Sequence, residues 1–244
     1  SPSSSDHGLA VVATTTQICD YVTQIAAKSA DISLDKTDAA GKNSHVGAAP
    51  DSAALTMSLT CLLAPNASAH EHEMTPAQTS ALAQADVMAV SGVDLEHFLD
   101  DAVVSSGFKG RMVVTSGVLT AADVDNPGAP DPEGAYTIDR GGERVDVAPW
   151  PFPPEEAGEE PEFRFDPHVW TSPKGARVQV ANLGAGLAAA APDAASSINA
   201  ATASYLEEID ALDQWTAESI ETVPEGQRVL FTSHDAFGYF SRDY

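Results

Sequence analysis

Three histidines lie in short motifs that are far apart in the chain. They are His70 in His-Glu-His-Glu-Met-Thr-Pro, His168 in Asp-Pro-His-Val-Trp, and His234 in Thr-Ser-His-Asp-Ala-Phe-Gly-Tyr-Phe. Imidazole is the commonest protein ligand of zinc and also suits other transition metals. Three imidazoles brought together by folding would leave one position of a tetrahedral ion to fill. A lone histidine would be assigned to the surface or the core, but three of the chain's seven in such motifs indicate a metal site.

The first half of the chain alternates between strand and helix patterns. Apolar runs at 9–14, 54–63, 87–90 and 111–115 predict strands, because they are short, rich in branched residues and bounded by turn residues. Helices are predicted after Thr15 or Thr16, from Thr75-Pro76 to about Ala85, and over 95–104 with Glu96 and His97. Polar residues 33–52 and the acidic, Pro- and Gly-rich residues 121–164 predict loops. This alternation predicts an α/β fold with a mainly parallel sheet.

The second half predicts two helices and one strand. The helices are expected from Pro173 to about Ala190 and over 194–220, with the strand at 229–232. In open parallel sheets, ligand sites lie at the carboxyl ends of the strands. His70 follows strand 54–63, His234 follows strand 229–232, and His168 precedes a helix. We therefore expect the three histidines to face one cleft between two lobes.

Charge and cysteine content narrow the class of protein. The net charge is −24, which disfavours nucleic acid and anionic membrane surfaces as partners. No run of 18 apolar residues is present, so a transmembrane helix is not expected. Cys19 and Cys61 are the only cysteines, and adjacent strands would bring them near each other. One disulfide and two buried free thiols are both compatible with this spacing.

At the histidine motifs the sequence resembles the solute-binding proteins of bacterial zinc and manganese ABC transporters, the TroA-like or cluster A-I metal-binding family. Residues 166–170 and 232–240 are similar to the second and third ligand segments of that family. Residues 70–76 resemble the first segment less closely, since Ser68-Ala69 replaces Asp-Pro and Met74 replaces a proline. The resemblance covers most of the chain except 30–50 and 121–160.

The resemblance implies a two-lobed protein. Each lobe would be a mainly parallel sheet flanked by helices, with a long helix between the lobes. The implied divisions are a polar N-terminal tether at 1–8, an N-terminal lobe at 9–172 containing the acidic loop 121–164, a connecting helix at 173–191, and an incomplete, truncated C-terminal lobe at 192–244.

It also implies that His70, His168 and His234 are the metal ligands. His72 is a rival to His70, although alignment through Glu73 and Thr75-Pro76 favours His70. An Asp or Glu beyond Tyr244 would be the fourth ligand. A histidine as third ligand favours Zn2+, with Mn2+ or Fe2+ as alternatives, and Asp235 and other carboxylates are expected to orient the ligand rings.

The function implied by the resemblance is capture of a divalent metal ion outside the cytoplasm and its delivery to an ABC-transporter permease. We expect a non-enzymatic monomer, periplasmic or held at the cell surface through a lipidated N-terminus that precedes this chain. Two alternatives are a zinc-dependent hydrolase with a three-histidine site and a base such as Glu71, Glu73 or Asp235, and a surface adhesin. The acidic residues of 151–162 would either gather cations or form a solvated linker.

Overall fold

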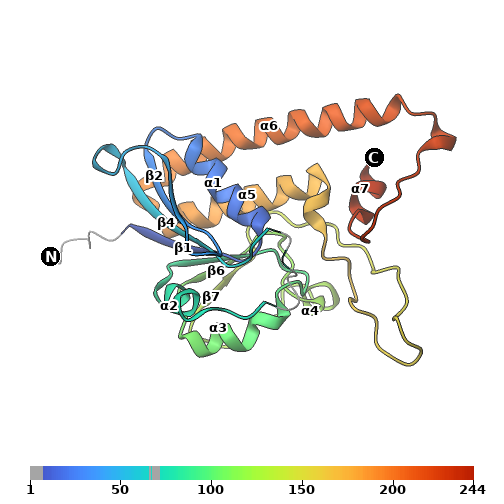
Figure 1. Cartoon of the computed structure of the whole chain (residues 1–244), viewed down its shortest axis with the longest axis horizontal. Helices are drawn as coiled ribbons and strands as arrows, with labels where there is room; N and C mark the ends of the chain where they lie inside the picture. The colour runs from blue at the N-terminus through green and yellow to red at the C-terminus, as the bar shows by residue number, and fades with distance from the viewer. Residues whose placement is uncertain (1–7, 66, 68–71) are drawn as a thin grey trace.

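The computed structural model describes residues 8–65, 67 and 72–244, and seven strands in this part of the chain form one sheet (Figure 1). The strands are β1 (Leu9–Ala13), β2 (Ile32–Thr37), β3 (Asn43–Gly47), β4 (Leu55–Cys61), β5 (Val87–Val90), β6 (Arg111–Val114) and β7 (Thr137–Asp139). Their spatial order is β3-β2-β4-β1-β5-β6-β7, and every neighbouring pair is parallel except β2 and β3. The predicted α/β fold with a mainly parallel sheet is therefore confirmed.

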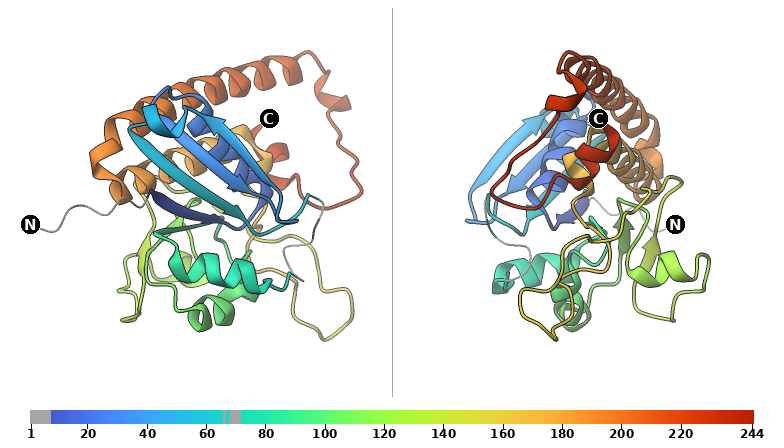
Figure 2. Two further views of the ribbon diagram at one scale, coloured as in Figure 1. Left: turned by 60° about the vertical axis from the view of Figure 1, so that its left-hand side comes forward. Right: turned by 90° about the vertical axis from the view of Figure 1, so that its right-hand side faces the viewer.

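Helices cover both faces of the sheet (Figures 1 and 2). One face carries α1 (Thr16–Ala27), α5 (Pro173–Ala190) and α6 (Ala195–Glu221), and the other carries α2 (Pro76–Gln84) and α3 (Asp100–Ser106). Successive residues of β1 show why both faces need cover. Val11 packs against the α1, α5 and α6 side, while Val12 packs against the α2 and α3 side. A strand buried on both faces must be apolar throughout, as this run is.

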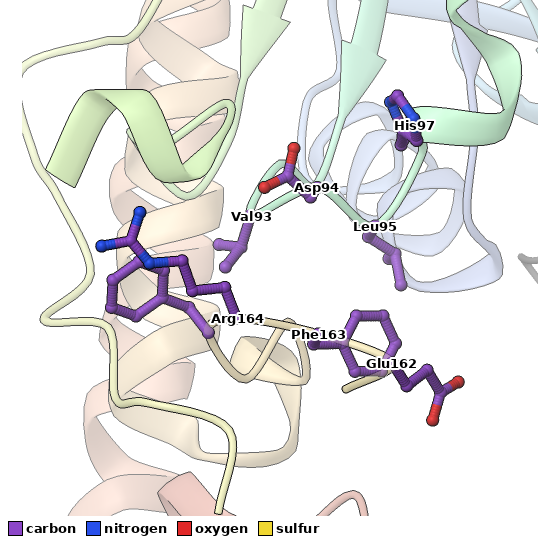
Figure 3. Close-up of a pocket in the computed structure, with 8 residues that line it drawn as sticks. Val93, Asp94, Leu95, His97, Glu162, Phe163 and Arg164 are labelled. Carbon is purple, nitrogen blue, oxygen red and sulfur yellow. The ribbon is translucent and has the colours of Figure 1, made fainter. Parts of the chain in front are cut away.

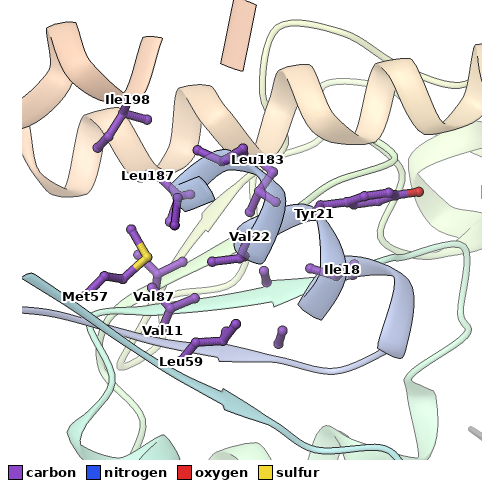
Figure 4. Packing of buried hydrophobic residues seen from close by; sticks show 14 of the residues in the cluster. Val11, Ile18, Tyr21, Val22, Met57, Leu59, Val87, Leu183, Leu187 and Ile198 are labelled. Carbon is purple, nitrogen blue, oxygen red and sulfur yellow. The ribbon is translucent and has the colours of Figure 1, made fainter. Parts of the chain in front are cut away.

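The larger apolar layer lies between the sheet and helices α1, α5 and α6 (Figure 4). Val22 of α1 and Leu183 and Leu187 of α5 face Val11 and Val87 of the sheet, and each is nearly or fully buried. Burying one such side chain contributes roughly 1.5–3 kcal/mol. This packing fixes α5 on the sheet and, with it, the residues that immediately precede α5.

Residues 33–52, predicted as a loop, instead contain the antiparallel pair β2 and β3 and a short helical turn, Pro50–Ser52. The prediction was wrong because β3 lies at the edge of the sheet. Its residues are almost all exposed, so they carry the polar side chains of a loop. In β2 the first three residues, Ile32, Ser33 and Leu34, are all buried, and the polar Ser33 between the two apolar residues hides the strand pattern.

The helix predicted over 95–104 is shorter. The chain forms a 3-10 turn at His97–Leu99 and then α3 at Asp100–Ser106. The preceding residues cannot be helical because Val93 and Asp94 have φ of 54° and 57°. Glu96 turns back instead, and its carboxylate accepts hydrogen bonds from the backbone N–H of Ser91 at 2.6 Å and of Gly92 at 3.1 Å.

The long segment 121–164 is not wholly irregular. It contains α4 (Ala121–Asp125) and β7, which extends the sheet beyond β6. The end of the segment is paired through an antiparallel bridge between Pro149 and Phe165. The N–H of Trp150 donates to the carbonyl of Arg164 at 3.0 Å, which continues this short ribbon.

The strand predicted at 229–232 is absent from the structure, where these described residues form no ladder. Phe231 is 91% exposed, so the segment's apolar side chains meet no sheet within the described chain. A β-branched, apolar pattern alone does not make a strand without a partner strand to bond with.

Cys19 and Cys61 form a disulfide that ties α1 to the end of β4. The parallel pairing of β1 with β4 places Ala13 opposite Cys61, and α1 begins just after β1. Of the two possibilities that the sequence left open, the structure has the disulfide. Disulfides persist in oxidising compartments, which agrees with a location outside the cytoplasm.

The packing of α5 bears on the predicted lobes. α5 lies on the sheet along its length, whereas the second half of α6 extends past it, with Leu212 and Trp215 exposed (Figure 1). This favours α6 over residues 173–191 as a connecting element, and the domain boundaries stay a prediction. The tether at 1–8 falls almost wholly outside the described residues. In the part of the chain described, no helix is long and apolar enough to span a membrane.

Candidate metal centre

His168 is held at the entrance to α5 by the aspartate of its own motif. Oδ1 of Asp166 accepts a hydrogen bond from the backbone N–H of His168 at 3.0 Å and from its ring Nδ1 at 2.7 Å. Such an aspartate turn is a common way for an Asp to fix the backbone two residues on. Because the carboxylate is an acceptor, Nδ1 carries the proton, and Nε2 of His168 keeps its lone pair for a ligand.

The motif around His234 docks on the motif around His168. The Tyr239 hydroxyl donates to the carbonyl of Asp166 at 2.6 Å and accepts from the N–H of Ala148 at 3.0 Å. The Thr171 hydroxyl lies 3.0 Å from the carbonyl of His168 and 2.8 Å from that of Ala236, so it links both segments. These contacts explain why polar and aromatic residues surround both histidines.

Gly238 is required by the same contact. A Cβ at this position would lie 2.7 Å from Oδ2 of Asp166, which is too close for two non-bonded atoms. The third motif therefore has a glycine where its chain passes the buried carboxylate. α7 (Gly238–Asp243) begins at this residue and keeps Tyr239 in the apolar cluster with Val169.

The two motifs bring the rings of His168 and His234 together. Their ring centres are 5.4 Å apart and their planes are nearly perpendicular, at 82°. His168 is 4% exposed, while His234 is on the surface. Convergence of these two predicted ligands agrees with the expectation from sequence. Within the described residues, no group of three or more His, Cys, Asp or Glu side chains is placed to hold a metal ion.

His70, the remaining predicted ligand, lies outside the described residues. Its rival His72 is described and is half-buried, with Nε2 3.1 Å from Oε1 of Gln78. Gln78 also closes a capping box with Thr75 at the start of α2, as the sequence predicted for this helix start. His72 thus has a partner at the helix terminus.

Asp166, not Asp235, orients a ligand ring in this structure. Asp235 is exposed, and among the described residues no hydrogen bond joins it to either histidine ring. Among the carboxylates expected to orient the rings, the one that the structure places against His168 is therefore Asp166, because the sequence gives adjacency but not the direction of a side chain. The Asp-Pro-His motif itself contained the signal, since an Asp two residues before a His is positioned for the turn described above.

Aromatic rings surround His168 on its other sides. The ring centres of Trp150, Phe163 and Trp170 lie 5.7, 6.0 and 5.4 Å from that of His168. Trp150 and Phe163 flank the acidic residues 151–162, and the centres of their rings are 5.1 Å apart. The acidic composition of residues 151–162 did not indicate a role for these two aromatic residues, although both precede the Asp-Pro-His motif by fewer than twenty positions, at about 18 and 5 residues before His168.

A buried polar network lies under the carboxyl ends of β1, β5 and β6. Glu96 is at its centre, and burial raises the pKa of its carboxyl to about 7 despite the backbone hydrogen bonds that favour the ionised form. The amide of Gln179, on α5, donates to Oγ of Ser91 at 3.0 Å and lies 3.3 Å from Oγ1 of Thr115. Its Oε1 accepts from the Tyr21 hydroxyl at 3.0 Å. This network ties α5 to the strand ends.

The motif around His168 lies near the carboxyl end of β1. Trp170 and Thr171, just after His168, line a pocket with Gln17 and Asp20 of the first turns of α1. α1 itself follows the carboxyl end of β1. The residues after His168 thus lie beside the start of α1, and a common cleft for the three histidines stays a prediction.

Comparison with solved structures supports this fold. Zn(II)-bound AdcA from Streptococcus pneumoniae is similar over 98% of this chain and 38% of its own, with a TM-score of 0.63 and 20% identity. A mostly parallel sheet flanked by helices matches the fold of TroA-like solute-binding proteins.

Residues 53–244 match the family model described as ZnuA, zinc-uptake complex component A, periplasmic, and the chain belongs to this family. The manganese-binding lipoprotein MntA of Bacillus subtilis is 28% identical over 99% of this chain and 60% of its own length. The iron-binding protein YfeA of Yersinia pestis is 27% identical over 74% of this chain and 47% of its own. The chain thus spans 60% or less of these curated relatives. Members of the family are metal-binding transport proteins and not enzymes, and neither the hydrolase nor the adhesin alternative is supported.

Proposed function

We propose that this chain captures a divalent transition metal ion outside the cytoplasm, with Zn2+ as the preferred ion, and belongs to a protein that delivers the ion to an ABC-transporter permease. The observation that carries the proposal is the pairing of His168 with His234, with Asp166 fixing the His168 ring. Partners of this kind hold the tautomer and orientation of a metal-ligating histidine and make it more basic.

The spacing of the two rings supports a shared ion. With a zinc–nitrogen bond of about 2.0–2.1 Å, two imidazoles on a tetrahedral zinc would have ring centres about 5 Å apart. The observed separation is 5.4 Å. The separation of the ring centres is therefore compatible with one ion bound through one nitrogen of each ring.

The choice of zinc rests on the donors. MntA is named for manganese and YfeA for iron, so these relatives do not agree on one ion. Imidazole nitrogens suit zinc better than manganese, which prefers carboxylate, carbonyl and water oxygens. His70 is proposed as the third ligand, and a carboxylate from further residues of the whole protein as the fourth.

Transport and location follow from the family. Binding of the ion would stabilise a closed arrangement of two lobes that the permease recognises, and α6 is suited to connect them. Relatives include lipoproteins by name, which supports anchoring at the outer face of the membrane through a lipidated residue upstream. We propose that the protein acts as a monomer.

The test is a competition titration of the chain with zinc and a chromophoric chelator, in the wild type and in His168→Ala. We expect one zinc site per chain and a loss of affinity of at least about 100-fold in the variant, since removing even the partner of a ligand typically costs 10–100-fold. His45→Ala is the matched control, because His45 lies on the edge strand β3 and bonds to Asp35. Zinc affinity in His168→Ala within twofold of the wild type would refute the assignment.

A further inference from the structure

The aromatic rings of Trp150, Phe163 and Trp170 form an apolar wall around His168, and the orientation of the His168 ring does not depend on them. Three aromatic ring centres lie within 6.0 Å of the His168 ring centre, and with His234 they leave His168 only 4% exposed. Asp166 already orients the ring through Nδ1, so the aromatic residues are not required for that purpose. A different role has to explain why apolar rings cover a residue that must reach an ion.

A short ribbon delivers two of these rings. The bridge between Pro149 and Phe165 and the hydrogen bond from the N–H of Trp150 to Arg164 hold the ends of the acidic segment together. Trp150 and Phe163 lie just inside this ribbon, in edge-to-face contact at 84°. The ribbon thus fixes both rings against His168, although the segment between them is exposed and irregular.

Phe163 also lines a pocket of about 410 Å³ (Figure 3). The pocket is bounded by Val93, Leu95 and Arg164, and the Phe163 ring lies beside Leu95. Phe163 thus borders both this open pocket and the His168 ring, a position from which its side chain would shield His168 from solvent in the pocket. Removing the ring would let water reach the free nitrogen of His168.

We propose that Trp150 and Phe163 determine the choice of ion by excluding water from the side of the site next to His168. Zinc accepts four ligands and needs no more than one water, whereas manganese favours octahedral coordination with several oxygen ligands. A wall of apolar rings beside His168 cannot supply oxygen ligands and leaves no room for water. The wall therefore penalises a six-coordinate ion and leaves a four-coordinate ion unaffected. This inference rests on the proposed function, since it concerns the same site.

The test compares zinc and manganese affinities of the wild type with those of Phe163→Ala and Trp150→Ala. We expect manganese binding to tighten and zinc binding to change little, so that the zinc-to-manganese affinity ratio falls about tenfold, the lower end of effects seen for residues around metal ligands. Phe152→Ala is the control, because Phe152 is in the same segment and contacts Trp150 but, among the described residues, makes no ring contact with His168. Its ratio should equal that of the wild type.

A spectroscopic readout separates this role from simple loss of packing. Cobalt bound with four ligands absorbs visible light much more strongly than cobalt bound with six. We expect strong absorption from the cobalt-loaded wild type, weaker absorption from Phe163→Ala, and recovery in Phe163→Leu, which keeps an apolar side chain.

Two results would overturn the inference and leave the proposed function in place. One is an equal loss of zinc and manganese affinity in Phe163→Ala, and the other is an unchanged cobalt spectrum. A wild-type chain that binds neither zinc nor manganese would overturn the proposed function, and this inference with it.

Discussion

Replacing Asp166 by Asn tests whether this carboxylate supports His168, the proposed metal ligand. Oδ1 of Asp166 accepts from both the backbone N–H and the ring Nδ1 of His168, and the carboxylate is almost completely buried. Asparagine keeps the size of the side chain and one acceptor oxygen. It removes the negative charge that strengthens the hydrogen bond from Nδ1 of His168.

The expected size follows from the type of hydrogen bond. A hydrogen bond to a charged group contributes about 1.5–3 kcal/mol and one between neutral groups about 0.5–1.5 kcal/mol. The charge of Asp166 therefore stabilises the hydrogen-bonded orientation of the His168 ring by about 1–2 kcal/mol. At 1.4 kcal/mol for each factor of ten, Asp166→Asn should weaken zinc binding about 5- to 30-fold.

The measurement is a chelator-competition titration of zinc at constant pH and salt, with circular dichroism to show that each variant is folded. Asp235→Asn is the control, because Asp235 also neighbours a predicted ligand but is exposed and makes no bond to either ring in the described residues. We expect its affinity to stay within twofold of the wild type. An equal loss of zinc affinity in Asp235→Asn, or no loss in Asp166→Asn, would show that Asp166 is not the carboxylate that supports His168.

Two further predictions concern stability. Burial raises the pKa of Glu96 from 4.5 to about 7, so the folded chain holds this proton more tightly than the unfolded chain. The resulting contribution of Glu96 to the free energy of unfolding is fully present below pH 4.5 and is lost as the pH rises through 7. The loss is at most about 3 kcal/mol. Urea unfolding from pH 4.5 to 8 should show this fall in the wild type but not in Glu96→Gln, and parallel curves would contradict it. The Cys19–Cys61 disulfide closes a loop with a sequence separation of 42 residues, so Cys19→Ser with Cys61→Ser should lower the free energy of unfolding by about 4 kcal/mol. A loss below about 1 kcal/mol in urea would mean that the unfolded chain gains little from the crosslink.

The sequence predicted the interior of the sheet well because burial on both faces leaves little choice of residue. β1, β5 and β6 are short apolar runs, and the predicted bounds agree with the structure within a residue. The edge of the sheet was missed for the opposite reason. Only Val46 of β3 packs against the apolar core and its other residues are exposed, so its composition does not differ from that of a loop.

In the candidate metal centre, features that depend on neighbouring residues were predicted, and features that depend on distant contacts were not. The pairing of His168 with His234 could be predicted, because each lies in a motif whose chemistry is contained in a few consecutive residues. Its surroundings could not, because they depend on contacts between distant positions. Tyr239 reaches the carbonyl of Asp166 across 73 residues, and Trp150 meets His168 only because the ribbon brings 149 against 165. A sequence pattern identifies the atoms that bind an ion, whereas the exclusion of water around those atoms depends on packing. In the proposed site, selectivity for one ion should therefore be easier to alter through Trp150 and Phe163 than through the histidines, whose replacement is expected to remove binding altogether.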